Sequence, residues 1–329
     1  MARKHHPRRG SLAFYPRKKA AKETPSFRYF PLTDNVMPLA FYGYKAGMTH
    51  LIARNEHKKS VTYGQDLQLP VTVVEVPALR VFGIRTYGKG NTGNLIVLLD
   101  VLAEKTSKHL LRALHAIKKV KHSLNELDAL KEGLVEVRLL CHTQPDKCGF
   151  GKKKPAITEI ALGGREKIAE QLSYAKEKLG KELSISEVFK EKEFIDVKAV
   201  TKGQGMEGVV NRFGVKTLRH PKHKKERIIG SISPWHPPLV MWQVPRPGQQ
   251  GYHSRTEFNK QILMMSNAVE KINPKGDFVG YGKVLNDFVL LHGTIPGPRK
   301  RLIGLRKAGR PAPLGELGEI SFISLASKQ

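Results

Sequence analysis

The chain has 329 residues, and its 57 Lys and Arg outnumber its 29 Asp and Glu, so that the formal net charge is +28. A surplus of this size repels itself in a folded protein and is tolerable only where a polyanion neutralises it. The charge balance therefore argues against a typical enzyme and favours a nucleic-acid partner, whose affinity should fall steeply with salt.

Hydrophobic residues make up 40% of the sequence, which at this length permits one large or two ordinary domains with true cores. No run approaches the roughly 18 to 20 apolar residues of a membrane helix, and charges occupy the first positions, where a secretory signal would be apolar. These features predict a soluble protein that is not secreted and has no membrane partner.

The N-terminal segment, residues 1–22, is basic and holds no acid before Glu23. Pro7, Gly10 and Pro16 interrupt it, and like-charged segments with few apolar groups stay extended until a partner neutralises them. We therefore expect a basic RNA-binding extension over residues 1–35, with a solvated tail or a localisation signal as the alternative. The cations of residues 1–22 are Arg3, Lys4, Arg8, Arg9, Arg17, Lys18, Lys19 and Lys22.

Short β-prone runs bounded by Gly and Pro begin after this extension. Such runs at this spacing predict an antiparallel barrel or sandwich. They are Val36–Tyr42, Val71–Ile84, Leu95–Leu102, Ile195–Val200, Leu239–Val244, Val279–Leu291 and Ile320–Leu325.

The middle third of the chain has a different pattern, with two apolar stripes at helical spacing. The first stripe begins at Leu110 and ends at Ile117, and the second begins at Ile168 and ends at Leu179. Alternation around Val137 predicts a half-buried strand between them, and Ser184 with Glu187 fits a capping box. We therefore predict an α/β domain over residues 101–190, inserted in a β-rich body formed by 36–100 and 191–329.

Cys141 and Cys148 are the two cysteines. A zinc site needs four ligands at short paired spacings, and neither a C-x-x-C pair nor a second pair of cysteines is present. Ordinary thiols are expected, with no metal and no disulfide.

Residues 201–260 carry the strongest functional signal, because cations alternate there with rings and prolines. A loop of this length that cannot pair its own backbone is usually functional or disordered, and RNA offers phosphates for the cations and unpaired bases for the rings. We predict a long basic loop over residues 211–260. The expected RNA-binding side chains of residues 201–260 include Lys202, Arg212, Lys216, Arg219, His220, Lys222, His223, Lys224, Lys225, Arg227, Trp235, His236, Arg246, Tyr252, His253 and Arg255.

The two tryptophans of this segment receive different interpretations. Trp235 stands among prolines beside a histidine, which favours a stacking role over a core role. Trp242 lies within the apolar run Leu239–Val244 and is expected to be a core aromatic.

The stretch from Gly203 to Gly208 satisfies the G-x-G-x-x-G pattern of nucleotide-binding loops. Such a loop must open a helix directed at the pyrophosphate, whereas a basic loop follows here after Phe213. The region about 20 residues on offers Lys222 to Lys225 in place of a ribose-binding acid. We expect these glycines to let the backbone pass close to RNA, and we predict no cofactor and no small-molecule substrate.

The sequence resembles ribosomal protein three of the large subunit, in the archaeal and eukaryotic form of that universal family. The similarity runs from residue 8 to about residue 306. The matching motifs are Arg8 to Lys18, Gly43-Tyr44-Lys45-Ala46-Gly47-Met48-Thr49-His50, Asp196 to Val209, Trp235-His236-Pro237, Gly248-Gln249-Gln250-Gly251-Tyr252-His253-Ser254-Arg255-Thr256-Glu257, and Asn286-Asp287-Phe288-Val289-Leu290 with Gly293, Pro296 and Gly297.

The resemblance implies a mainly β fold: a six-stranded β-barrel of the translation-protein type, an inserted α/β domain and long basic RNA-binding extensions. It implies a non-enzymatic protein of the cytoplasmic ribosome that organises large-subunit rRNA, especially its 3′ portion, beside neighbouring large-subunit proteins. The long loop would reach toward the peptidyl transferase centre with Trp235 near its tip, and Gln249 joins the expected RNA contacts. Assembly of the subunit and translation would depend on it.

Two features separate the chain from the eukaryotic pattern. Pro234 and Pro238 flank Trp235 and His236 where that form has smaller residues, and the sequence ends soon after the last expected strand. An archaeal form is therefore expected.

Two other functions are alternatives to rRNA organisation. An RNA-modifying or RNA-cleaving enzyme would use His253, Glu257 and Asp287, with Asp277 as a further acid, but no spacing ties these residues into a catalytic constellation. A free translation factor is suggested only by the type of barrel. We expect no catalytic residue.

Overall fold

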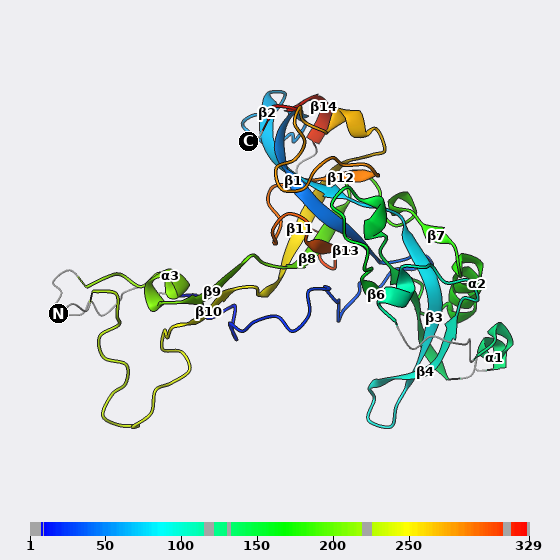
Figure 1. Ribbon diagram of the computed structural model, residues 1–329, viewed down its shortest axis with the longest axis horizontal. Helices are drawn as coiled ribbons and strands as arrows, with labels where there is room; N and C mark the ends of the chain where they lie inside the picture. Colours follow the sequence, from blue (N-terminus) through cyan, green and yellow to red (C-terminus); the bar gives the residue numbers. More distant parts are fainter. Residues whose placement is uncertain are drawn as a thin grey trace. The chain divides into compact units, whose positions relative to one another are not determined.

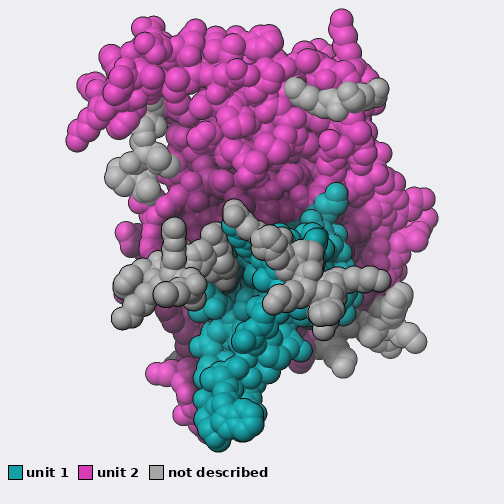
Figure 2. All heavy atoms as spheres, turned by 90° about the vertical axis from the view of Figure 1, so that its left-hand side faces the viewer, with its two compact units in different colours: residues 1–22, 200–255 teal, residues 23–199, 256–329 magenta. Residues whose placement is uncertain are grey.

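The structure is a computed structural model that describes residues 8, 10–114, 122–129, 133–218, 226–311 and 317–327. Its chain contacts separate two compact units (Figures 1 and 2). Unit 1 comprises residues 1–22 and 200–255, and unit 2 comprises residues 23–199 and 256–329. The secondary structure is mainly β, as predicted. Among the described residues, no helix is long and apolar enough to cross a bilayer.

The first sheet of unit 2 is antiparallel and has the strand order β13-β8-β11-β12-β2-β1-β14, with a further pairing between β13 and β1. Strand β1 begins buried on both faces of this sheet, because the consecutive side chains Phe41 and Tyr42, and Tyr44 after them, are almost completely covered. The strands are β1 Ala40–Asn55, β2 Asp66–Glu75, β8 Phe194–Val200, β11 Ser254–Ser266, β12 Phe288–His292, β13 Leu302–Lys307 and β14 Leu317–Ile323.

Strand β1 passes close to its neighbours at the glycines of the Gly43 to His50 motif. A side chain on Gly47 would put its Cβ 2.6 Å from Cδ1 of Phe278, and one on Gly43 would meet Val76 and the carbonyl of Glu75. Both positions therefore require the absence of a side chain.

The second sheet of unit 2 has the order β4-β3-β5-β6, with β7 paired to the start of β3. Helix α2 (Ile168–Lys178) packs on β5 and β3 and buries Leu172 and Ala175. The other elements of this region are β3 Leu79–Lys89, β4 Leu95–Leu102, β5 Leu134–His142, β6 Ile157–Ala161, β7 Glu182–Leu183, α1 Leu124–Ala129 and the 3-10 turns Leu110–Arg112, Pro145–Lys147 and Ile185–Glu187; the turn Val269–Lys271 follows β11.

Several predicted elements are confirmed. The strand expected at Leu95–Leu102 is β4, the alternating segment around Val137 is β5, and the stripe that begins at Ile168 is α2. The capping box of Ser184 and Glu187 is formed at the start of a 3-10 turn.

Other predictions were wrong. The run Leu239–Val244 forms no strand, because prolines on both sides leave it without a pairing partner, and only the end of Val279–Leu291 is strand. The stripe at Leu110 forms a three-residue 3-10 turn, and positions 115–121, which include Ile117, lie outside the described residues. The run Val71–Ile84 is broken after Glu75 by Pro77, so that its two halves belong to different sheets.

In unit 1, β9 (Gly203–Glu207) pairs with β10 (Gly248–Gly251) as an antiparallel hairpin. Helix α3 (Val209–Phe213) follows β9 and ends at Gly214, whose φ of 65° is the left-handed conformation of a helix C-terminus. A short helix does therefore follow the G-x-G-x-x-G stretch, contrary to our prediction. Gly203 and Gly205, however, lie in a strand of a hairpin, and only Gly208 precedes the helix, so the three glycines form no phosphate-binding turn.

Candidate nucleic-acid interface

Unit 1 holds most of the charge imbalance. Its two sequence segments contain eighteen Lys and Arg against two acids, Glu207 and Glu226, while the much longer unit 2 has the remaining 39 cations against 27 acids. Because unit 1 lacks the acids that would neutralise it, an external anion is needed.

The tip segment, which we define as residues 228–242, follows this basic region and is almost entirely uncovered by the chain. Trp235 is 88% exposed and Trp242 is 63% exposed, so that Trp242 is not the core aromatic we predicted. Isolated apolar side chains on a surface are normal, but a continuous uncovered run indicates a binding site.

Charge and apolar surface alternate along this loop. Residues 228–245 contain no Lys, Arg, Asp or Glu, whereas the exposed Arg227 and Arg246 stand at the two ends of that stretch. Cations at both ends suit phosphates, and exposed rings between them suit stacking on unpaired bases.

The N-terminal segment contacts α3 through arginine. The guanidinium of Arg17 donates to the carbonyls of Arg212 (2.7 Å) and Ser11 (3.1 Å) and lies 4.3 Å from the ring centroid of Phe213. Arg212 returns a hydrogen bond to the carbonyl of Arg17 (3.0 Å) and also donates to the carbonyls of Arg246 and Gln249. These two arginines therefore stabilise unit 1 itself.

Their charges are not compensated by an acid within this arrangement. Burial and then the charge of Arg17 lower the pKa of Arg212 and of Arg255 from the ordinary value of arginine. The cluster of cations consequently attracts an anion even though its hydrogen bonds are partly used.

Aromatic contacts complete the packing of this segment. Tyr15 contacts Phe213 (6.3 Å between ring centroids) and Trp242 edge-on (5.1 Å). A Cβ on Gly10, whose φ is +75°, would lie 2.5 Å from Phe213. The described part of the segment is therefore packed against α3, which differs from the expectation that it stays extended until RNA binds; rings and arginine stems supply apolar contacts that the charge count did not reveal.

His253 is buried, with 7% of its surface exposed, which differs from our expectation of a surface RNA contact. Its Nδ1 lies 3.0 Å from the carbonyl oxygen of Lys18, and its backbone N–H donates to Thr201 Oγ1. The neighbouring Tyr252 has a φ of 52°, and its carbonyl accepts a hydrogen bond from Ala20. This turn therefore positions the end of the N-terminal segment.

The other predicted RNA-binding residues are either partly buried, exposed, or outside the described residues. Gln249 is half-buried and donates to the carbonyls of Gln250 and Gly251, while the guanidinium of Arg255 lies 5.0 Å from the ring centroid of Phe14. Arg8 is exposed and donates to the carbonyl of Gln243. The exposed set is Lys18, Lys19, Lys202, Lys216, Arg227, Trp235, His236 and Arg246. Nine predicted residues lie outside the described residues: Arg3, Lys4, Arg9, Arg219, His220, Lys222, His223, Lys224 and Lys225.

Sequence reasoning missed the aliphatic part of the surface. Apart from Met206, which lies in β9, these side chains could have been found as apolar residues without strand or helix periodicity inside a proline-rich loop. They are Met206, Ile228, Ile232, Leu239, Val240 and Met241, all exposed.

The residues suspected of catalysis have other roles where the structure describes them. Glu257 pairs with Lys260 at 3.0 Å, and the backbone carbonyl of Asp287 accepts a hydrogen bond from the N–H of Val76 (2.8 Å). Within the described ranges, no three His, Cys, Asp or Glu side chains are grouped as metal ligands. Cys141 and Cys148 are both buried free thiols, and burial raises their pKa.

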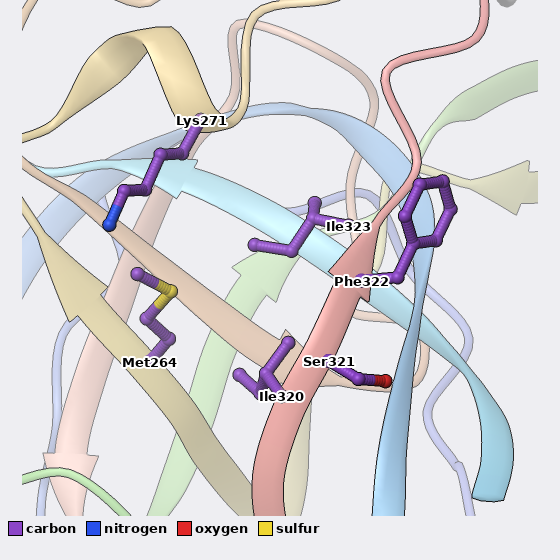
Figure 3. A pocket seen from close by; sticks show the side chains of 6 residues that line it. All are labelled: Met264, Lys271, Ile320, Ser321, Phe322 and Ile323. Carbon is purple, nitrogen blue, oxygen red and sulfur yellow. The ribbon is translucent and has the colours of Figure 1, made fainter.

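Unit 2 has a shallow pocket of about 320 Å³ between β11 and β14 (Figure 3). Met264, Ile320 and Ile323 provide apolar walls, and Lys271 is the one ionisable side chain among the six that line it. The pocket therefore lacks the paired acid and base that catalysis requires.

Comparison with known proteins agrees with this picture. The model of the family described as "Ribosomal protein L3" matches residues 1–329. The large ribosomal subunit protein uL3 of Methanocaldococcus jannaschii is 46% identical over 330 residues, covering 99% of this chain and 98% of its own length. That of Methanococcus vannielii is 47% identical with the same coverage, and that of Methanothermobacter thermautotrophicus is 45% identical over 100% and 99% of the two chains. These relatives are archaeal ribosomal proteins and not enzymes, and this chain belongs to the ribosomal protein L3 family.

Proposed function

We propose that the chain is a structural constituent of the large ribosomal subunit, where unit 1 binds and organises large-subunit rRNA, especially its 3′ portion. The family, and archaeal relatives that are large ribosomal subunit proteins uL3, support the assignment to this particle. The single observation that carries the RNA-binding role is the uncovered tip segment, with its exposed Trp235, between basic flanks.

The proposal divides the predicted RNA-binding residues by task. The exposed cations would meet phosphates, while Trp235 and His236 would stack on bases. These cations are Lys18, Lys19, Lys202, Lys216, Arg227 and Arg246. Arg17, Arg212 and His253 would hold the unit together for that contact.

The same proposal includes the reach of the loop toward the peptidyl transferase centre, with support for subunit assembly and translation. It rests on the family resemblance and on the projecting, uncovered tip segment. A photo-crosslinker in place of Trp235 should react with rRNA nucleotides of that centre in purified subunits, and reaction only with other nucleotides would contradict it.

We also propose that six strands of the first sheet close into a barrel. The pairing of β13 with β1 supports this, because it joins the two ends of the order β13-β8-β11-β12-β2-β1. In the corresponding domain organisation, the basic extension is 1–35 and the loop is 211–260. The barrel body and the inserted part meet near residue 79 instead of residue 101, since β3 pairs with β5 and β4 pairs with β3.

The decisive test of RNA binding is its salt dependence. The variant Lys216→Gln/Arg227→Gln/Arg246→Gln should weaken binding to a fragment of the 3′ portion of large-subunit rRNA. It should also reduce the slope of log affinity against log salt by roughly 0.7 to 0.9 for each phosphate that the variant no longer neutralises. Filter binding or fluorescence anisotropy over a salt series would measure both quantities.

The matched control is Lys58→Gln/Lys59→Gln/Lys108→Gln, which removes the same charge from exposed positions of unit 2. The proposal expects an almost unchanged slope for this control. Equal slopes for the two triple variants would show that net charge, and not unit 1, carries the binding.

A further inference from the structure

The hairpin of β3 and β4 ends in apolar side chains that the chain does not cover. Leu95, Ile96, Val97 and Leu98 are 41%, 47%, 48% and 39% exposed. Because successive side chains of a strand point to opposite faces, both faces of this hairpin end are open. Four consecutive uncovered apolar residues are rare on a protein surface without a binding role.

The backbone of β4 is open as well. The strand stands at the end of the order β4-β3-β5-β6, and no strand in the described ranges pairs with its outer side. Residues Leu95 to Val97 continue the antiparallel ladder with Tyr87 to Lys89, so the outward N–H and C=O groups are arranged for another strand.

Edge strands are usually protected by charge or by short length, and the first five residues of β4, Leu95 to Leu99, have neither protection. The other end of this sheet is β6, which has five residues and carries Glu159, and the edge strand β14 of the first sheet carries Glu319. The eight residues of β4 include no charge before Asp100. An edge without such protection is a template for strand addition.

The absence of charged residues near this edge favours a protein partner over RNA. The ten residues between Lys89 and Asp100 contain no Lys, Arg, His, Asp or Glu, in a chain with 57 Lys and Arg. An RNA surface would leave the four apolar side chains without a counterpart and would find no cation for its phosphates, whereas a protein strand satisfies both the side chains and the backbone.

We propose that the outer edge of β4, from Leu95 to Leu99, binds an extended apolar segment of another protein by strand addition. This interface differs from the RNA surface of unit 1 in position and in chemistry. It rests on the proposed function only in placing the partner in the same particle.

Cross-linking in purified large subunits tests the proposal. A benzoylphenylalanine at position 96 should cross-link to one protein, at a mapped extended segment of mainly apolar residues. The same group at the fully exposed Val61 should not. Backbone amides of residues 95–99 should also exchange more slowly in the particle than in the free protein. Cross-linking to rRNA or to a second copy of the chain, or unchanged exchange, would overturn it.

A variant tests the strength of the contact. Ile96→Thr/Val97→Thr removes apolar surface but keeps β-branched residues, so the strand itself should persist. It should weaken binding of the full chain to a peptide of the cross-linked segment by about tenfold or more. Val61→Thr is the matched control, with the same chemical change at an exposed site outside β4.

The slope of log rRNA affinity against log salt distinguishes a failure of this inference from a failure of the proposed function. The β4 variant should leave that slope unchanged, because the slope depends on the cations of unit 1. Loss of peptide binding with a normal slope supports the β4 interface, whereas full peptide binding by the variant refutes it, whatever RNA binding shows.

Discussion

The two units differ in how their arginines are satisfied. In unit 2, Arg85 pairs with Asp100 and Glu159, and Arg306 pairs with Asp196 at positions that are almost fully buried. In unit 1, Arg17 and Arg212 donate to backbone carbonyls, and no ion pair joins two described residues of that unit.

This difference has a physical consequence. A buried ion pair neutralises both of its members, whereas a carbonyl accepts a hydrogen bond from arginine without removing the charge. Unit 2 therefore uses its arginines for its own stability, while unit 1 keeps a net positive charge that remains available to an anion.

The largest effect on stability is expected at a buried ion pair of unit 2. Asp196→Ala should lower the free energy of unfolding by about 3 to 5 kcal/mol, because it leaves Arg306 buried without its partner and Asn259 N–H without its acceptor. Chemical denaturation would measure the change. Glu177→Ala, at an exposed pair with Lys181, should lower the free energy of unfolding by less than about 0.5 kcal/mol. Equal losses in the two variants would contradict the claim that unit 2 is stabilised by its buried ion pair.

A glycine tests the internal packing of unit 1. Gly10→Ala should destabilise the contact of the N-terminal segment with α3 by about 2 kcal/mol, since it adds a Cβ 2.5 Å from Phe213 at a left-handed backbone position. Hydrogen exchange of the amides of residues 209–214 should accelerate.

The control for this change is Gly230→Ala, where an added Cβ meets nothing within 4 Å. Its exchange rates should match those of the unchanged protein. Unaltered exchange in Gly10→Ala would mean that the segment does not need Phe213.

Local pattern predicted much of unit 2. Strand β4 and helix α2 were found from their sequences because their periodicity and flanking residues are local properties. The sequence did not predict that β3 and β4 belong to the second sheet. The pairing of β3 with β5 joins segments about 50 residues apart, and the sequence of neither strand alone indicates its partner.

The site was predictable in composition but not in geometry. The basic, ring-rich character of residues 201–260 is visible in the sequence, and it located Trp235 in an exposed loop. The exchange of hydrogen bonds between Arg17 and Arg212 joins positions 195 residues apart, and the burial of His253 depends on the carbonyl of Lys18. Only the tertiary fold distinguishes such structural cations from exposed ones.

The tip segment should separate binding from stability. Trp235→Ala should change the free energy of unfolding by less than about 0.5 kcal/mol, because the ring contributes little to any core, yet weaken rRNA binding by about 1 to 3 kcal/mol if it stacks on a base. Tyr63→Ala, at an exposed ring of unit 2, should leave rRNA binding unchanged. A large loss of stability in Trp235→Ala would show that the ring belongs to a core.

The smallest expected effect is a pH dependence within unit 2. Burial, followed by the charge of Arg80, lowers the pKa of His142, and burial and Lys260 lower that of His292. The folded protein therefore binds fewer protons than the unfolded chain below the ordinary histidine pKa of about 6.5. Stability should be complete above that pH and should fall as the pH decreases toward the lowered values.

We expect this loss to stay below about 1 kcal/mol between pH 7 and pH 5.5. Within that window carboxylates remain ionised, so the slope reports histidine. His142→Gln should flatten part of the slope and His292→Gln another part, and an unchanged slope in both variants would contradict the assignment. Since both histidines lie in unit 2, hydrogen exchange should detect the change in the amides of β5 and β12 and leave those of α3 unaffected, which would show that the two units respond to protons separately.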